Sequence, residues 1–156
     1  MALKTQLTEI FFVDTYTSGT PAVTKLACPT GITGLGGAKD QIDTTCLDAT
    51  DRTFEAGLGN PGQVSIPFIL DTTSASHDVL FDIKEDGAVL NWMVCLSDGT
   101  ADPTIDSEDD LTPPAGRSYF KFAAYIADVN IDIAGNDVVR GTLTLQRSGT
   151  VTYVSK

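Results

Sequence analysis

The dominant pattern along the chain is an alternation of apolar and polar residues, broken by short clusters of Gly, Pro, Ser and Thr. Residues 118–133 alternate most strongly, and residues 138–147 alternate again after the turn-forming stretch AGND. A period of two residues is typical of a β-strand with one buried face. We therefore expect two long strands here, the first with Phe120, Phe122, Ala124 and Ile126 on its apolar face.

Shorter runs of the same kind lie on both sides of this pair. They predict strands at 10–15, 40–46, 52–58, 64–70, 89–96 and 151–154. Pro67 lies inside one of them, which favours a position at a sheet edge or a bulge, because proline cannot donate a ladder hydrogen bond. Gly149 is expected to form a turn before the last short strand. The single tryptophan, Trp92, is expected in the core.

One segment has helical spacing instead. Val79, Leu80 and Ile83 share a face at a period of 3.6 residues, and Ser74 is among the residues able to cap the first turn. Gly87 suits the position just after a helix end. The sequence thus predicts a helix over about 74–86.

The fold class that follows is mainly β: an antiparallel β-sandwich or barrel with one flanking α-helix. The 156 residues suit a single domain, 1–156, with no internal repeat. Between the strands, residues 98–117 form a long acidic loop that contains three prolines. A stretch of this length without periodicity is usually functional or mobile.

The charge balance excludes one class of function. The chain has 21 acidic and 10 basic residues, a net charge of −11, and its basic residues are scattered singly. Tight binding of DNA or RNA needs clustered Lys and Arg against the phosphates. This surface is expected to repel nucleic acid, although acidity also serves solubility alone.

Residues 34–62, "GLGGAKDQIDTTCLDATDRTFEAGLGNPG", invite a phosphate-binding or metal-binding interpretation. The glycines match neither common phosphate-binding pattern, and Asp40 follows Lys39 where a hydroxyl residue is needed. A calcium loop starting at Asp82 fails because Lys84 and Met93 occupy ligand positions. We expect turns and strands here, and no cofactor.

Catalytic chemistry has few candidate residues. His77, the only histidine, falls at the expected helix start, where a polar end residue is the simpler interpretation. Cys28, Cys46 and Cys95 lack zinc-site spacing and are expected as free thiols, with a Cys28–Cys46 bridge left open. No carboxylate pair stands out, so we expect no enzyme and no metal site.

Apolar runs are short throughout. The longest, Phe122–Ala127, has six residues, whereas a membrane-spanning helix needs about 20. The first residues lack an apolar block long enough for a signal peptide. The expectation is synthesis in a cytoplasm without a membrane partner.

Residues 31–68, "GITGLGGAKDQIDTTCLDATDRTFEAGLGNPGQVSIPF", resemble the N-terminal half of the major tail tube proteins of long, non-contractile phage tails. The similar features are a glycine-containing segment that leads into the strand DQIDTT, the strand itself, an acidic turn and a later glycine segment. The expected helix, residues 92–99 at the end of the next expected strand and "GTLTLQRSG" at 141–149 are similar too. The resemblance covers about 120 residues, and an additional C-terminal domain of some relatives is not seen.

This resemblance implies a structural subunit of a virion tail, assembled in the host cytoplasm. Six copies would form a ring, and rings would stack into a hollow conduit with other tail proteins at its ends. DNA would pass through without specific binding. The candidate lumen-facing residues are Gln41, Asp43, Thr45, Thr142, Thr144 and Gln146, and the candidate inter-ring loop residues are Asp98, Asp102, Asp106, Glu108, Asp109 and Asp110.

Three alternatives remain open from the sequence. One is a tube or terminator protein of a contractile tail or secretion system. Another is a ligand-binding β-sandwich, for which folding would have to gather Tyr16, Tyr119, Tyr125 and Tyr153. The third is a hydrolase that uses a pair of carboxylates.

Overall fold

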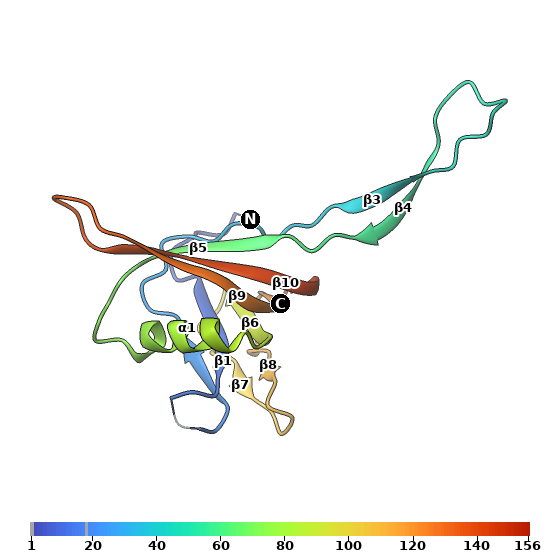
Figure 1. Cartoon of the computed structure of the whole chain (residues 1–156). Helices are drawn as coiled ribbons and strands as arrows, with labels where there is room; N and C mark the ends of the chain where they lie inside the picture. The colour runs from blue at the N-terminus through green and yellow to red at the C-terminus, as the bar shows by residue number, and fades with distance from the viewer. Residues whose placement is uncertain (1, 18) are drawn as a thin grey trace.

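A computed structural model describes residues 2–17 and 19–156. Its centre is an antiparallel six-stranded sheet with the strand order β2-β1-β6-β9-β10-β5 (Figure 1). The strands are β1 (Glu9–Asp14), β2 (Ala22–Lys25), β5 (Gln63–Ile69), β6 (Leu90–Cys95), β9 (Tyr119–Asp132) and β10 (Arg140–Val154). The prediction of a mainly β, antiparallel fold is confirmed, and in the single chain the sheet is open, with β2 and β5 at its edges.

The main core lies on the face of the sheet that the helix covers. Trp92 on β6 is fully buried and stacks on Phe12 of β1, with ring centroids 4.9 Å apart. From β9, Phe122, Ala124 and Ile126 join the same core, as their alternation predicts. Each large apolar side chain buried in this way contributes roughly 1.5–3 kcal/mol to folding.

The helix α1 (Ala75–Asp86) crosses this face in front of the sheet (Figure 1). Val79, Leu80 and Ile83 are buried against the strands, which confirms the face that their spacing predicts. Ser74 is at the N-cap position, but its side chain makes no capping hydrogen bond. Gly87 ends the helix in the left-handed conformation, with φ of 68°, and its amide bonds to the Ile83 carbonyl.

A smaller apolar cluster lies on the other face, over β1 and β6. Phe11, Val13, Met93, Cys95 and Leu111 are buried in it. The hairpin of β7 (Thr104–Ile105) and β8 (Leu111–Thr112) supplies Leu111 and Ile105 to this cluster. The acidic segment 98–117 therefore contains regular structure, where the sequence predicted only a loop, because two apolar residues hold it against the sheet.

The remaining hairpin projects away from the body of the molecule. It consists of β3 (Lys39–Asp43) and β4 (Phe54–Gly59), and Figure 1 shows it extending beyond the end of β5. We call residues 39–59 the arm. Nearly every residue of its strands is exposed, including Ile42, Phe54 and Leu58, and Leu47 at its tip is fully exposed.

The strand predictions differ from the structure at β10 and at β2, and agree with it at Pro67. β10 continues through Gly149, which adopts a φ of 86° at a register shift instead of a turn. β2 carried too weak a pattern to be predicted. Pro67 does lie on an edge strand, and residues 28–33 cover part of that edge, with the Thr30 amide bonded to the Pro67 carbonyl at 2.8 Å.

Candidate assembly surfaces

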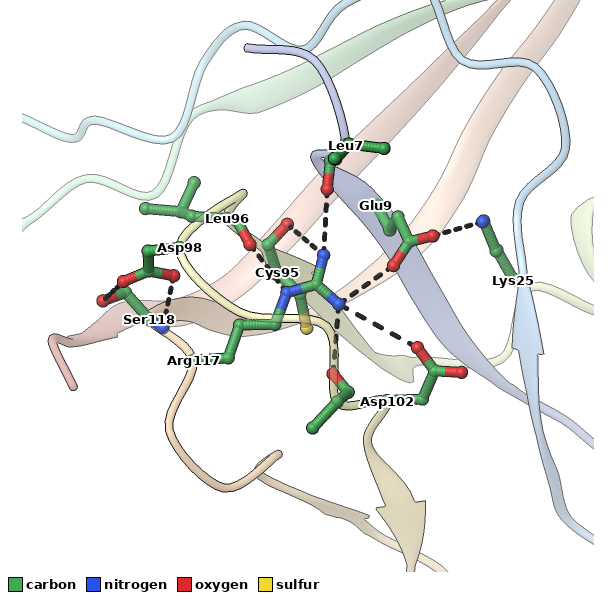
Figure 2. Close-up of polar contacts among 10 residues, drawn as sticks. Leu7, Glu9, Lys25, Cys95, Leu96, Asp98, Asp102, Arg117 and Ser118 are labelled. Carbon is green, nitrogen blue, oxygen red and sulfur yellow. Dashed lines mark hydrogen bonds and ion pairs between the residues drawn. The ribbon is translucent and has the colours of Figure 1, made fainter. Parts of the chain in front are cut away.

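A buried arginine anchors the acidic segment to the sheet. Arg117 is 2% exposed, and all three nitrogens of its guanidinium donate hydrogen bonds (Figure 2). Nε donates to the Leu96 carbonyl at 2.6 Å, and Nη1 donates to the Glu9 carboxylate at 2.9 Å. The other acceptors are the backbone carbonyls of Leu7, Cys95 and Ala101. The guanidinium thus has its full set of partners within one chain.

Glu9 is the counter-ion of this arginine and also bonds to Lys25 on β2. Burial raises the pKa of Glu9, but the hydrogen bonds from Lys25 and Arg117 outweigh it and hold the pKa below its ordinary value. Asp102 lies farther from Arg117, at 3.9 Å, and is largely exposed. The carboxylate of Glu9 is therefore held ionised against a buried cation.

Four of the six predicted inter-ring acids stabilise the segment itself, and Asp102 beside Arg117 is one of them. Asp98 accepts hydrogen bonds from the amide and hydroxyl of Ser118, which lower its pKa. Asp106 caps the turn before β8, and Asp110 pairs with Lys121 at 2.7 Å. The other two, Glu108 and Asp109, are exposed at the hairpin turn, with no side-chain partner among the described residues. The carboxylates of these two are therefore free to contact another molecule.

The predicted lumen residues divide into two separate groups. Thr142, Thr144 and Gln146 share the face of β10 that the helix does not cover, since Leu143 and Leu145 between them are buried. Their neighbours on β5 are Pro67, Ser65 and Gln63. Apart from Pro67, these side chains are polar and uncharged, and Arg140, at the start of β10, shares their face and pairs with Asp137.

The other group lies on the arm. Gln41 and Asp43 are on β3, and Thr45 follows at the arm tip. The Asp43 carboxylate accepts hydrogen bonds from the amide and the hydroxyl of Thr45, which lower the pKa of Asp43. Thr45 in turn accepts a hydrogen bond from the Thr53 amide at 3.0 Å. Asp43 and Thr45 therefore organise the arm tip, and the structure does not bring this group to the open face of β10.

The residues considered for chemistry lie apart. His77 is buried, where the sequence favoured a polar end residue: Nδ1 accepts from the Asp71 amide at 3.0 Å and Nε2 contacts the Ala27 carbonyl at 2.8 Å. The three cysteines are free thiols, and burial raises the pKa of Cys95 to about 11. Residues 2–17 and 19–156 contain no group of three side chains placed to hold a metal ion.

None of the described helices is long and apolar enough to cross a membrane.

The sequence interpretation missed the two buried arginines, Arg117 and Arg147. A signal for Arg147 was present, because strand alternation places it on the same face as Leu143 and Leu145. For Arg117 the only signal was a lone base at the end of an acidic stretch.

With this geometry established, known proteins give a direct comparison. A family model described as "Phage tail tube, TTP, lambda-like" matches residues 1–156. The chain belongs to the lambda-like phage tail tube protein family. It is accordingly a structural component of the virion tail, as its resemblance to tail tube proteins implies.

Individual relatives agree with the family. "Structural protein 3" of Pseudomonas phage PAJU2 is 35% identical over 158 residues, which span 99% of this chain and 94% of that protein. The SPP1 tail tube is 11% identical, with a TM-score of 0.69 over 99% of this chain and 81% of that one.

The tail of a gene transfer agent particle, described with C6 symmetry, is 14% identical, with a TM-score of 0.67 over 99% and 100%. Tube components of contractile injection systems share the fold as well. At these identities the solved structures show a common fold.

Proposed function

We propose that six copies of this tail tube protein close into a ring and that rings stack into a hollow tube, each chain acting as one tube domain over 1–156. The sixfold symmetry described for a gene transfer agent tail of the same fold supports this number. A ring of identical subunits needs a head-to-tail interface, in which two different surfaces of each copy meet. The exposed arm offers one of these two surfaces.

The observation that carries the proposal is the open face of β5 and β10. One face of this part of the sheet is buried under α1, and the other carries Thr142, Thr144 and Gln146 without an apolar residue among them on β10. A sheet with one polar face and one face packed against a core suits the wall of a water-filled channel. We assign this face to the lumen.

The arm is assigned to contacts between copies. Its apolar residues Ile42, Leu47, Phe54 and Leu58 are exposed, and the hairpin extends away from the body of the molecule. An isolated two-stranded hairpin is marginally stable in water, so packing on another copy would stabilise it. Glu108 and Asp109, at the β7–β8 turn, are assigned to contacts between rings.

The charge of the chain suits the passage of DNA. Arg140, the cation on this face of β10, is paired with Asp137, so the wall would release few counterions from the duplex and DNA would gain little by binding it. The net charge of −11 on each subunit adds a repulsive field around the conduit. DNA would pass without specific contacts, and neither a cofactor nor a catalytic step is required.

Electron microscopy of the purified protein tests this proposal. We expect rings or tubes with sixfold symmetry, spontaneously or after addition of the phage tail initiation proteins. A protein that stays monomeric at high concentration under both conditions would overturn it. The double variant T142K/T144K tests the lumen: tubes should still form, but DNA should be retained in them at low salt and released at high salt.

A further inference from the structure

A second buried arginine lies at the root of the arm, in surroundings unlike those of Arg117. Arg147, on β10, is 4% exposed. Among the residues that the structure describes, its guanidinium has one hydrogen-bond partner, the Gly36 carbonyl, which accepts from Nη2. Nε is fully buried and has none. No carboxylate lies within ion-pair distance in the described part of the chain.

The guanidinium borders a cavity of about 310 Å³. The segments that lead into and out of the arm form its walls, with Gly36, Gly37 and Lys39 on one side and Asn60 on the other. Thr150 of β10 also lines it. A space of this size accommodates a side chain with ordered waters. Its lining holds two cationic residues, Lys39 and Arg147, and no acid.

This arrangement is costly for a single chain. A buried charge is normally paired, and a guanidinium has five N–H donors to satisfy. The chain also has about twice as many acids as bases. The position of Gly37 keeps the site open, since a Cβ there would come within 3.0 Å of Arg147 Nη2. The cavity thus has the features of a site for a carboxylate.

We propose that the Arg147 cavity receives an aspartate from the arm tip of a second copy of this chain, Asp48 or Asp51, and that this contact links neighbouring subunits of the tube. The inference rests on the proposed assembly. Charge complementarity carries it: both aspartates are exposed and have no side-chain partner among the described residues. The arm tip is also the part of the chain that projects farthest from its own body (Figure 1).

The occupant comes from another copy because of distance and connectivity. Asp48 follows Lys39 by nine residues of an extended hairpin, which separates it from the arm root by roughly 20–30 Å. The C-terminal residue is held elsewhere, with the Lys156 amide bonded to the Ser118 hydroxyl. An aspartate entering the cavity would accept hydrogen bonds from the free guanidinium donors, a strong charge-assisted geometry.

Charge-removing variants give the first test. D48N/D51N should fold normally, because both residues are exposed, but should raise the protein concentration needed for assembly about tenfold or more. The matched control D40N/E55Q removes two exposed acids from the arm strands and should assemble as the parent does. Assembly of D48N/D51N at the parent concentration would overturn the proposal.

The native Cys46, two residues from Asp48, allows a direct test of position. In the variant C28S/T150C, oxidation of assembled material should link the Cys46 thiol of one copy to the thiol introduced at position 150 of the next and give a ladder of covalent oligomers. C28S/C46S/T150C should give no ladder. Tubes that form without this crosslink would overturn the cavity contact and leave the tube function intact, whereas absence of rings and tubes would overturn the function itself.

Discussion

Arg117 and Arg147 are both almost completely buried, yet their surroundings differ in one respect. Arg117 donates to an ionised carboxylate and four backbone carbonyls of its own chain. The Arg147 guanidinium donates to a single carbonyl among the described residues and borders a cavity. Removing a buried cation that has all its partners destabilises a fold, because those partners are left unpaired. A buried cation without its partners indicates an interaction that the single chain does not supply.

The largest expected effect comes from removing the complete network. R117M leaves Glu9 without its buried partner and several carbonyls without donors, so we expect a loss of about 3–5 kcal/mol in the free energy of unfolding. Chemical denaturation measures it. The control R140M breaks an exposed ion pair with Asp137 and should cost less than about 1 kcal/mol. Equal losses in the two variants would contradict the anchoring role of Arg117.

Two glycines test how tightly each arginine is enclosed. At Gly99, an added Cβ would come within 2.8 Å of both the Arg117 Cβ and the Gly116 carbonyl, so G99A should cost about 1–3 kcal/mol of stability. At Gly37 the nearest atom is the far end of the Arg147 side chain, at 3.0 Å, which has room to move. G37A should therefore cost clearly less in thermal or chemical unfolding, and the reverse order would contradict the difference in packing.

Replacing Arg147 by methionine should not lower the free energy of unfolding as R117M does. R147M replaces an incompletely paired buried cation by an apolar side chain of similar length, so the stability of the monomer should stay within about 1 kcal/mol or rise. Assembly should fail or need a higher concentration. Denaturation of the monomer and electron microscopy measure the two effects separately. A large loss of monomer stability would show that Arg147 is already complete in the single chain.

The smallest expected effect is a dependence on pH at the Arg117 network. The folded protein lowers the pKa of Glu9 from 4.5, so the ionised form stabilises the fold. This contribution is present above about pH 4.5 and is lost as the pH falls through the lower, folded pKa. E9Q should show a shallower loss of stability on acidification than the parent, and the control E108Q should follow the parent. Identical slopes for E9Q and the parent would contradict the assignment.

The prediction from sequence succeeded where a pattern is local. The alternation at 118–133 placed Phe122, Ala124 and Ile126 in the core, and the spacing of Val79, Leu80 and Ile83 placed the helix face. It was wrong at Gly149, because a positive-φ glycine fits a bulge within a strand as well as a turn between strands. It also gave the acidic segment no strands, since two-residue strands such as β7 leave no periodicity.

The candidate site residues show the same division. Thr142, Thr144 and Gln146 were predicted to share a polar face, and they do, because neighbours at a spacing of two in one strand must point the same way. Gln41, Asp43 and Thr45 have a similar pattern but lie on a separate hairpin. Strand pairing decides which polar faces adjoin, and that pairing depends on residues far apart in the chain.

By itself, the sequence determined the strand faces, the helix and its ends, the acidic surface and the resemblance to tail tube proteins. These features depend on periodicity, capping and composition, which act over a few residues or over the whole chain at once. Only the tertiary structure decided that Arg117 is complete, that Arg147 is not, and that residues 39–59 project as an arm. Burial and pairing are properties of neighbours in space, and no local pattern encodes which neighbours a side chain lacks.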